Sequence, residues 1–79
     1  MHKITILQIL RGAPSNGQLA VSLRTEMNAR QGERIGDIEF AEVLREMTEK
    51  GLIETEEDRL FGDKRVKLTA DGWGVARTI

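Results

Sequence analysis

Apolar residues recur every three or four positions in three stretches of the first fifty residues, which is the spacing of one buried helical face. The predicted helices span about 3–11, 17–29 and 37–50. Gly12 and Pro14 predict the end of the first helix, because glycine adopts the left-handed conformation there and proline cannot continue a helix. The side-chain oxygens of Ser15 and Asn16 can cap the second helix.

The third predicted helix carries the clearest apolar stripe. Its members are Phe40, Val43, Leu44 and Met47. Gly51 suits the left-handed position that closes a helix, and Leu52 should then fold back onto Met47. The segment 30–36 before this helix has no hydrophobic period and contains two glycines, so we expect a loop of about seven residues.

Strict alternation replaces helical spacing in the last third of the chain. Val66 and Leu68 alternate with Arg65 and Lys67, which is typical of a strand with one buried face. The pattern predicts a hairpin with strands over about 52–57 and 64–68, joined by a turn at Gly62-Asp63. The segment 71–79 is expected to be short and partly helical, since its two glycines weaken a helix.

A chain of 79 residues without cysteine predicts one domain over 1–79, with no disulfide and no thiolate metal site. The longest apolar run, 4–10, is far too short to cross a bilayer, so we expect a cytoplasmic protein without a membrane partner. The net charge is −1, with +3 over 1–34, −3 over 35–51 and −1 over 52–79. The third helix is therefore the acidic part of the chain.

The sequence offers no catalytic constellation. His2 is the only histidine and has no neighbouring group with metal-ligand spacing. Ser15 and Ser22 have no activating base, and no glycine-rich loop of the P-loop kind is present. We therefore expect no enzyme activity, no metal and no cofactor.

Two segments carry a resemblance to a known family. The segment 42–53 (EVLREMTEKGLI) is similar to the end of a recognition helix entering a wing, and 62–72 (GDKRVKLTADG) is similar to a wing tip with its L-T-x-x-G exit. Gln18-Leu19-Ala20 is a weaker match to the opening of the second helix. The chain thus resembles the winged helix-turn-helix superfamily, most of all the MarR and PadR bacterial regulators. The resemblance implies an α+β, mainly helical fold of three helices followed by a two-stranded wing.

The resemblance also implies a transcriptional regulator that binds double-stranded DNA, with the third helix in the major groove and the wing on the backbone. The candidate DNA contacts are Arg45 on the third helix, Arg59, Lys64, Arg65 and Lys67 on the wing, and Arg24, Arg30 and Arg34 on the second helix and its loop. The cations of the wing and of the second helix and its loop could instead form ion pairs within the protein. The wing cations can pair across the strands with Glu54, Glu56 or Glu57, and the three arginines with Glu26 or Glu33.

The exposed face of the third helix is acidic and leaves a second function open. Its residues are Glu39, Glu42, Arg45, Glu46 and Glu49. Pairs such as Glu42 with Arg45 and Glu46 with Lys50 would make it a solvated face, whereas Glu42 and Glu46 could also dock a basic partner. Leu60 and Phe61 can fold onto the third helix or anchor a partner or a second copy, and Trp73 and Ile79 raise the same alternatives. The alternative to a regulator is therefore a protein-interaction module that does not bind DNA, as a monomer or a homodimer.

Overall fold

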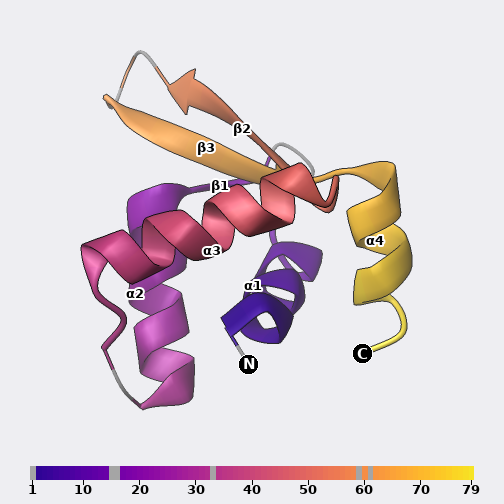
Figure 1. The fold of residues 1–79 in the computed structure, drawn as a ribbon, viewed down its shortest axis with the longest axis horizontal. Helices are drawn as coiled ribbons and strands as arrows, with labels where there is room; N and C mark the ends of the chain where they lie inside the picture. Colours follow the sequence, from indigo (N-terminus) through magenta and orange to yellow (C-terminus); the bar gives the residue numbers. More distant parts are fainter. Residues whose placement is uncertain (1, 15–16, 33, 59, 61) are drawn as a thin grey trace.

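The protein is described by a computed structural model covering residues 2–14, 17–32, 34–58, 60 and 62–79. Three helices precede a hairpin, and a fourth helix ends the chain (Figure 1). The elements are α1 (His2–Arg11), β1 (Gln18–Leu19), α2 (Ala20–Gln31), α3 (Asp37–Glu49), β2 (Ile53–Asp58), β3 (Asp63–Leu68) and α4 (Ala70–Ala76). The predicted order of three helices and a hairpin is confirmed.

The core forms where α1 packs against α2, α3 and α4 beneath the sheet. The fully buried large side chains are Ile6, Leu10, Leu23, Met27, Ile35, Met47, Ile53 and Val66. Each of the first three helices buries most of the stripe that its spacing predicts, although Ile4 of α1 is 49% exposed and Val43 of α3 is only partly buried. The buried residues of the hairpin are those of one strand face. The apolar side chains of the helices and of the hairpin therefore pack into one core.

The sheet has a third strand that the sequence did not predict. Its strand order is β1-β3-β2, all antiparallel, with Gln18 opposite Val66 and Leu19 opposite Arg65. Gly17 lies so close to β3 that an added Cβ would be 2.1 Å from the Val66 oxygen, and its φ is +84°. The extended backbone beside β3 delays the second helix to Ala20, so its predicted start at residue 17 is wrong.

The predicted cap of α2 is also wrong. Leu19 occupies the N-cap position and its side chain makes no capping hydrogen bond, while Ser15 and Asn16 lie outside the described residues. The backbone N–H of Val21 donates instead to Oδ2 of Asp63, at 3.0 Å. A carboxylate at the turn end of the wing, where β3 begins, thus satisfies a free N–H in the first turn of α2 and ties the wing to this helix.

The turn between α2 and α3 spans residues 32–36, shorter than predicted because α2 continues to Gln31. The guanidinium of Arg24 closes it, with Nη2 and Nε donating to the Ile35 oxygen at 2.9 and 3.2 Å and Nη1 paired with Asp37. Asn28 accepts the Ile35 N–H at 2.9 Å. These bonds position α3 relative to α2 and bury Ile35 between them.

The two segments that carried the family resemblance meet at one junction. Gly51 (φ +73°) donates to Thr48 and Leu52 donates to Met47, both at 3.0 Å, so the predicted return of Leu52 onto Met47 is confirmed. The Thr69 N–H donates to the Leu52 oxygen at 3.1 Å, and its hydroxyl donates to the Gly51 oxygen. The K-G-L-I and L-T-x-x-G segments therefore join the end of α3 to the start of α4.

The segment after Thr69 forms a regular helix in spite of its two glycines. Thr69 caps α4 by accepting the Gly72 N–H at 3.0 Å. Trp73 packs against the core, and Arg11 of α1 donates to the oxygens of Ala76 and Ile79 at 2.8 and 2.7 Å. Packing and capping therefore offset the low helix propensity of glycine.

Candidate nucleic-acid interface

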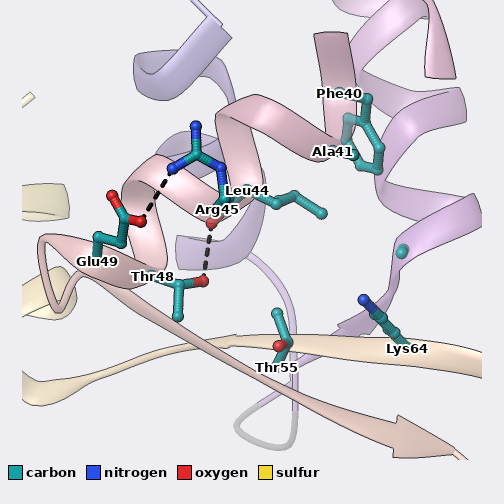
Figure 2. Close-up of a pocket in the computed structure, with 9 residues that line it drawn as sticks. Phe40, Ala41, Leu44, Arg45, Thr48, Glu49, Thr55 and Lys64 are labelled. Atoms are coloured by element: carbon teal, nitrogen blue, oxygen red, sulfur yellow. Dashed lines mark hydrogen bonds and ion pairs between the residues drawn. The ribbon is translucent and has the colours of Figure 1, made fainter. Parts of the chain in front are cut away.

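A groove of about 400 Å3 separates α3 from the β2–β3 hairpin (Figure 2). Apolar side chains, chiefly Phe40 and Leu44, line its floor, and Arg45, Glu49 and Lys64 stand around it. Arg45 comes from the outward side of α3 and Lys64 from β3, so one cation lies on each wall. The remaining lining residues are Ala20, Ala41, Thr48 and Thr55.

Arg45 already holds a partner on its own helix. Its Nη1 lies 2.9 Å from Oε1 of Glu49, one turn further on, and both side chains are more than half exposed. The expected pairing of Arg45 with Glu42 is thus replaced by pairing with Glu49. An exposed pair of this kind contributes only about 0–1 kcal/mol, so a stronger anion such as a phosphate can displace the carboxylate.

The wing cations divide between the two faces of the hairpin. Lys64 shares the inner face with Thr55 and Val66, whereas Arg65 and Lys67 alternate onto the opposite face. Nζ of Lys67 lies 3.8 Å from Glu56 and 4.0 Å from Glu54 across the strands. The structure therefore places Lys64 alone of these three cations on the groove.

The arginines of α2 and its loop do not form one cluster. Arg24 is engaged with Ile35 and Asp37 at the turn, and Arg30 pairs with Glu26 at 3.3 Å. Arg30 and Arg65 line a second hollow, of about 470 Å3, beside β1. Arg34 is exposed in the turn before α3.

The glutamates of α3 point in different directions. Glu39 lies 3.3 Å from Nε2 of His2. Glu46 forms its ion pair with Lys3 of α1 at 2.7 Å, whereas the expected partner Lys50 contributes only the weaker attraction of its charge. The hydrogen bond from Lys3 is the main reason why the pKa of Glu46 is lowered below its ordinary value. Glu42 is exposed on the outward side. The glutamates therefore do not form one continuous acidic face. Glu39 and Glu46 face α1, whereas Glu42 and Glu49 lie on the side of α3 away from the core.

An exposed isoleucine on the side of α3 away from the core was not among the residues singled out from the sequence. Ile38 is 77% exposed, although it lies in the first turn of the helix that carries the clearest buried stripe. The signal was present in the sequence, because Ile38 falls outside the spacing of Phe40, Leu44 and Met47. At the wing tip Leu60 is 89% exposed, so it is not buried against α3, and the candidates Arg59 and Phe61 lie outside the described residues.

No metal-binding group of three or more His, Asp or Glu side chains occurs among the residues that the structure describes. Within the same residues, no helix is both long and apolar enough to cross a membrane.

Three helices, the wing that follows them and the groove between α3 and that wing define a winged-helix fold. No family model matches the chain, and no curated protein sequence matches it. Among solved structures, RosR of H. salinarum has a TM-score of 0.84 at 20% identity, covering 98% of this chain and 66% of RosR.

RosR in the complex named RosR-S4 has the same TM-score and identity, covering 96% of this chain and 63% of that one. SSV1 F-93 has a TM-score of 0.73 at 19% identity, covering 98% of this chain and 78% of F-93. The chain thus spans slightly less than two thirds of the RosR chains. At these identities the similarity shows the shared winged-helix fold.

Proposed function

We propose that the chain is a single-domain, cytoplasmic, DNA-binding transcriptional regulator of the winged-helix class and is not an enzyme. The observation that carries the proposal is the groove with Arg45 on the α3 wall and Lys64 on the wing wall. In this arrangement α3 enters the major groove, which has the width of a helix, and the wing meets the adjacent backbone. The resemblance of the α3 end and the wing to MarR and PadR regulators supports the same function.

The charges around the groove determine how such binding would behave. Each phosphate neutralised by a cation steepens the dependence of log affinity on log salt by about 0.9. Arg45 and Lys64 together therefore give a slope of about −1.8. With a net charge of −1 the protein as a whole does not attract nucleic acid, so its affinity for an arbitrary duplex is low. The contacts that do form are confined to the groove.

The test is an amide NMR titration with a generic duplex, first at low and then at physiological salt. We expect shifts concentrated on the outward side of α3 and the inner face of the wing, and we expect salt to reverse them. An absence of shifts at low salt would overturn the proposal.

Two matched variants separate the groove from the rest of the wing. Lys64→Gln should flatten the salt slope by about 0.9, because it removes one phosphate contact. Lys67→Gln removes the same charge from the opposite face, where Glu54 and Glu56 already hold it, and should leave the slope unchanged. Equal effects of the two substitutions would show that the groove is not the contact surface.

The exposed Leu60 supports a second candidate function, a protein-interaction module on the same scaffold. A leucine that is 89% exposed at the wing tip can anchor a partner or a second copy. Leu60→Ser should then lower self-association in sedimentation velocity without changing thermal unfolding. Unchanged sedimentation would remove the wing tip from any contact between copies.

A further inference from the structure

We propose that α3 reads a C·G base pair through Glu42 and Arg45, together with a thymine about two base pairs away through Ile38. The inference rests on the proposed DNA-binding function and names the bases that the same helix would recognise.

The three side chains occupy one row on the side of α3 away from the core. At 100° per residue, Ile38, Glu42 and Arg45 fall within about 60° of one another and opposite the buried stripe. All three are exposed, Ile38 by 77% and the side chain of Arg45 by 61%. They belong to the first three turns of α3, and residues near the N-terminus of a recognition helix are the ones that reach base edges.

Glu42 differs from the other glutamates of α3. Glu39, Glu46 and Glu49 each hold a cationic or histidine partner, at 3.3, 2.7 and 2.9 Å. The carboxylate of Glu42 is exposed and makes no hydrogen bond or ion pair with any part of the chain that the structure describes. In a major groove a carboxylate repels phosphates, and the base group that suits it is the cytosine N4 amino donor.

Arg45 supplies the complementary half of the same base pair. It lies three residues after Glu42 in the same row, and arginine donates both of its parallel N–H groups to O6 and N7 of guanine. The Arg45–Glu49 contact is exposed, so exchanging Glu49 for a guanine edge costs little. A carboxylate for cytosine and a guanidinium for guanine together match one C·G pair.

Ile38 provides an apolar contact one turn before Glu42. The 5-methyl group of thymine is the apolar feature that a major groove presents, and an exposed isoleucine side chain packs against it. Four residues of helix span about 6 Å, which corresponds to about two steps of the roughly 3.4 Å rise between base pairs. The thymine is therefore expected about two base pairs from the C·G pair.

The experiment selects bound duplexes from a randomised library with the whole chain and with the variants Glu42→Gln, Ile38→Ala and Glu39→Gln. The Glu39→Gln control removes the same charge from the same helix, on the side that faces His2. Wild type and control should enrich a C·G pair with a thymine about two positions away. Glu42→Gln should lower the cytosine preference by about fivefold or more. Thermal unfolding of each variant checks that the fold is kept.

A change in the DNA itself tests Ile38 without altering the protein. Replacing the selected thymine by uracil removes only the methyl group and should weaken wild-type binding by about fourfold. The same replacement should not affect Ile38→Ala. Duplex binding without any enriched site, or the same site enriched by all variants, would overturn the base assignment while leaving DNA binding in place. A failure to bind any duplex at low salt would overturn the proposed function as well.

Discussion

Substituting alanine at Gly72 should destabilise the protein through the junction between α3, the wing and α4. A Cβ at this position would lie 1.9 Å from the Leu52 oxygen and 2.9 Å from the Leu52 carbon, which are backbone atoms that cannot rotate away. The Leu52 oxygen also accepts the Thr69 N–H, so moving it disturbs the hydrogen bonds that start α4. Gly72→Ala must therefore displace α4 from the end of the wing.

The size of the effect follows from three contributions. Forcing extra volume into a packed site costs about 1–3 kcal/mol. Weakening the Thr69 cap costs about 0.5–2 kcal/mol, and the better helix propensity of alanine returns about 0.5–1 kcal/mol. The net loss is about 0.5–4.5 kcal/mol, compared with the roughly 4–12 kcal/mol of stability expected for a domain of this size.

Urea unfolding measures the difference, with Gly74→Ala as the matched control. Gly74 lies in the same helix, and an added Cβ there would meet no atom within 4 Å. Gly74→Ala should therefore raise stability by about 0.5–1 kcal/mol, opposite in sign to Gly72→Ala. Equal shifts for both variants would refute the reasoning, because they would show that close packing on Leu52 does not require glycine at position 72.

Three further predictions follow from the charges of the structure. Glu49→Gln removes a carboxylate from the groove and should raise affinity for duplex DNA by about two- to fivefold in fluorescence anisotropy, whereas Glu54→Gln on the opposite face should not. Asp63→Ala removes the acceptor at the first turn of α2 and should cost about 1 kcal/mol in urea unfolding, with faster amide exchange in that turn. The lowered pKa of Glu46 contributes stability that is present above its ordinary value of 4.5 and is lost as pH falls below it. Glu46→Gln, or removal of its partner Lys3, should flatten that acid decline in thermal unfolding, and an unchanged decline would contradict the assignment.

The helices and the hairpin were predictable because each buries a regular stripe of apolar side chains. β1 was not, since two residues are too few to show alternation. The need for glycine at position 17 could not be predicted from the neighbouring residues either. It arises from the close approach of Val66, which exists only once β3 has paired with β1. Patterns of apolar residues thus identify helices and strands that bury one face. They do not identify a short edge strand such as β1, which is held by backbone pairing.

The sequence predicted individual residues of the candidate site better than it predicted which of them lie together. Alternation along β3 separates Lys64 from Arg65 and Lys67, so the division of the wing cations could have been read from the sequence. The role of Arg24 could not, because its main partner is the backbone oxygen of Ile35, which no residue type reveals. The pair of Glu46 with Lys3 likewise joins helices far apart in the chain.

The acidic outward side of α3 bears on specificity more than on whether DNA is bound. A carboxylate there weakens binding to every duplex equally, because it repels phosphates whatever their sequence. At one base pair Glu42 would recover a hydrogen bond from cytosine, so the ratio of specific to non-specific affinity rises even as both affinities fall. Selection among sites depends on that ratio. On an arbitrary duplex, where Arg45 and Lys64 both contact phosphates, the salt slope is about −1.8, and on the recognised site, where Arg45 contacts guanine, it falls to about the −0.9 expected from Lys64 alone. A measured slope much steeper than about −1.8 would mean that other cations, such as the exposed Arg34, also contact the backbone.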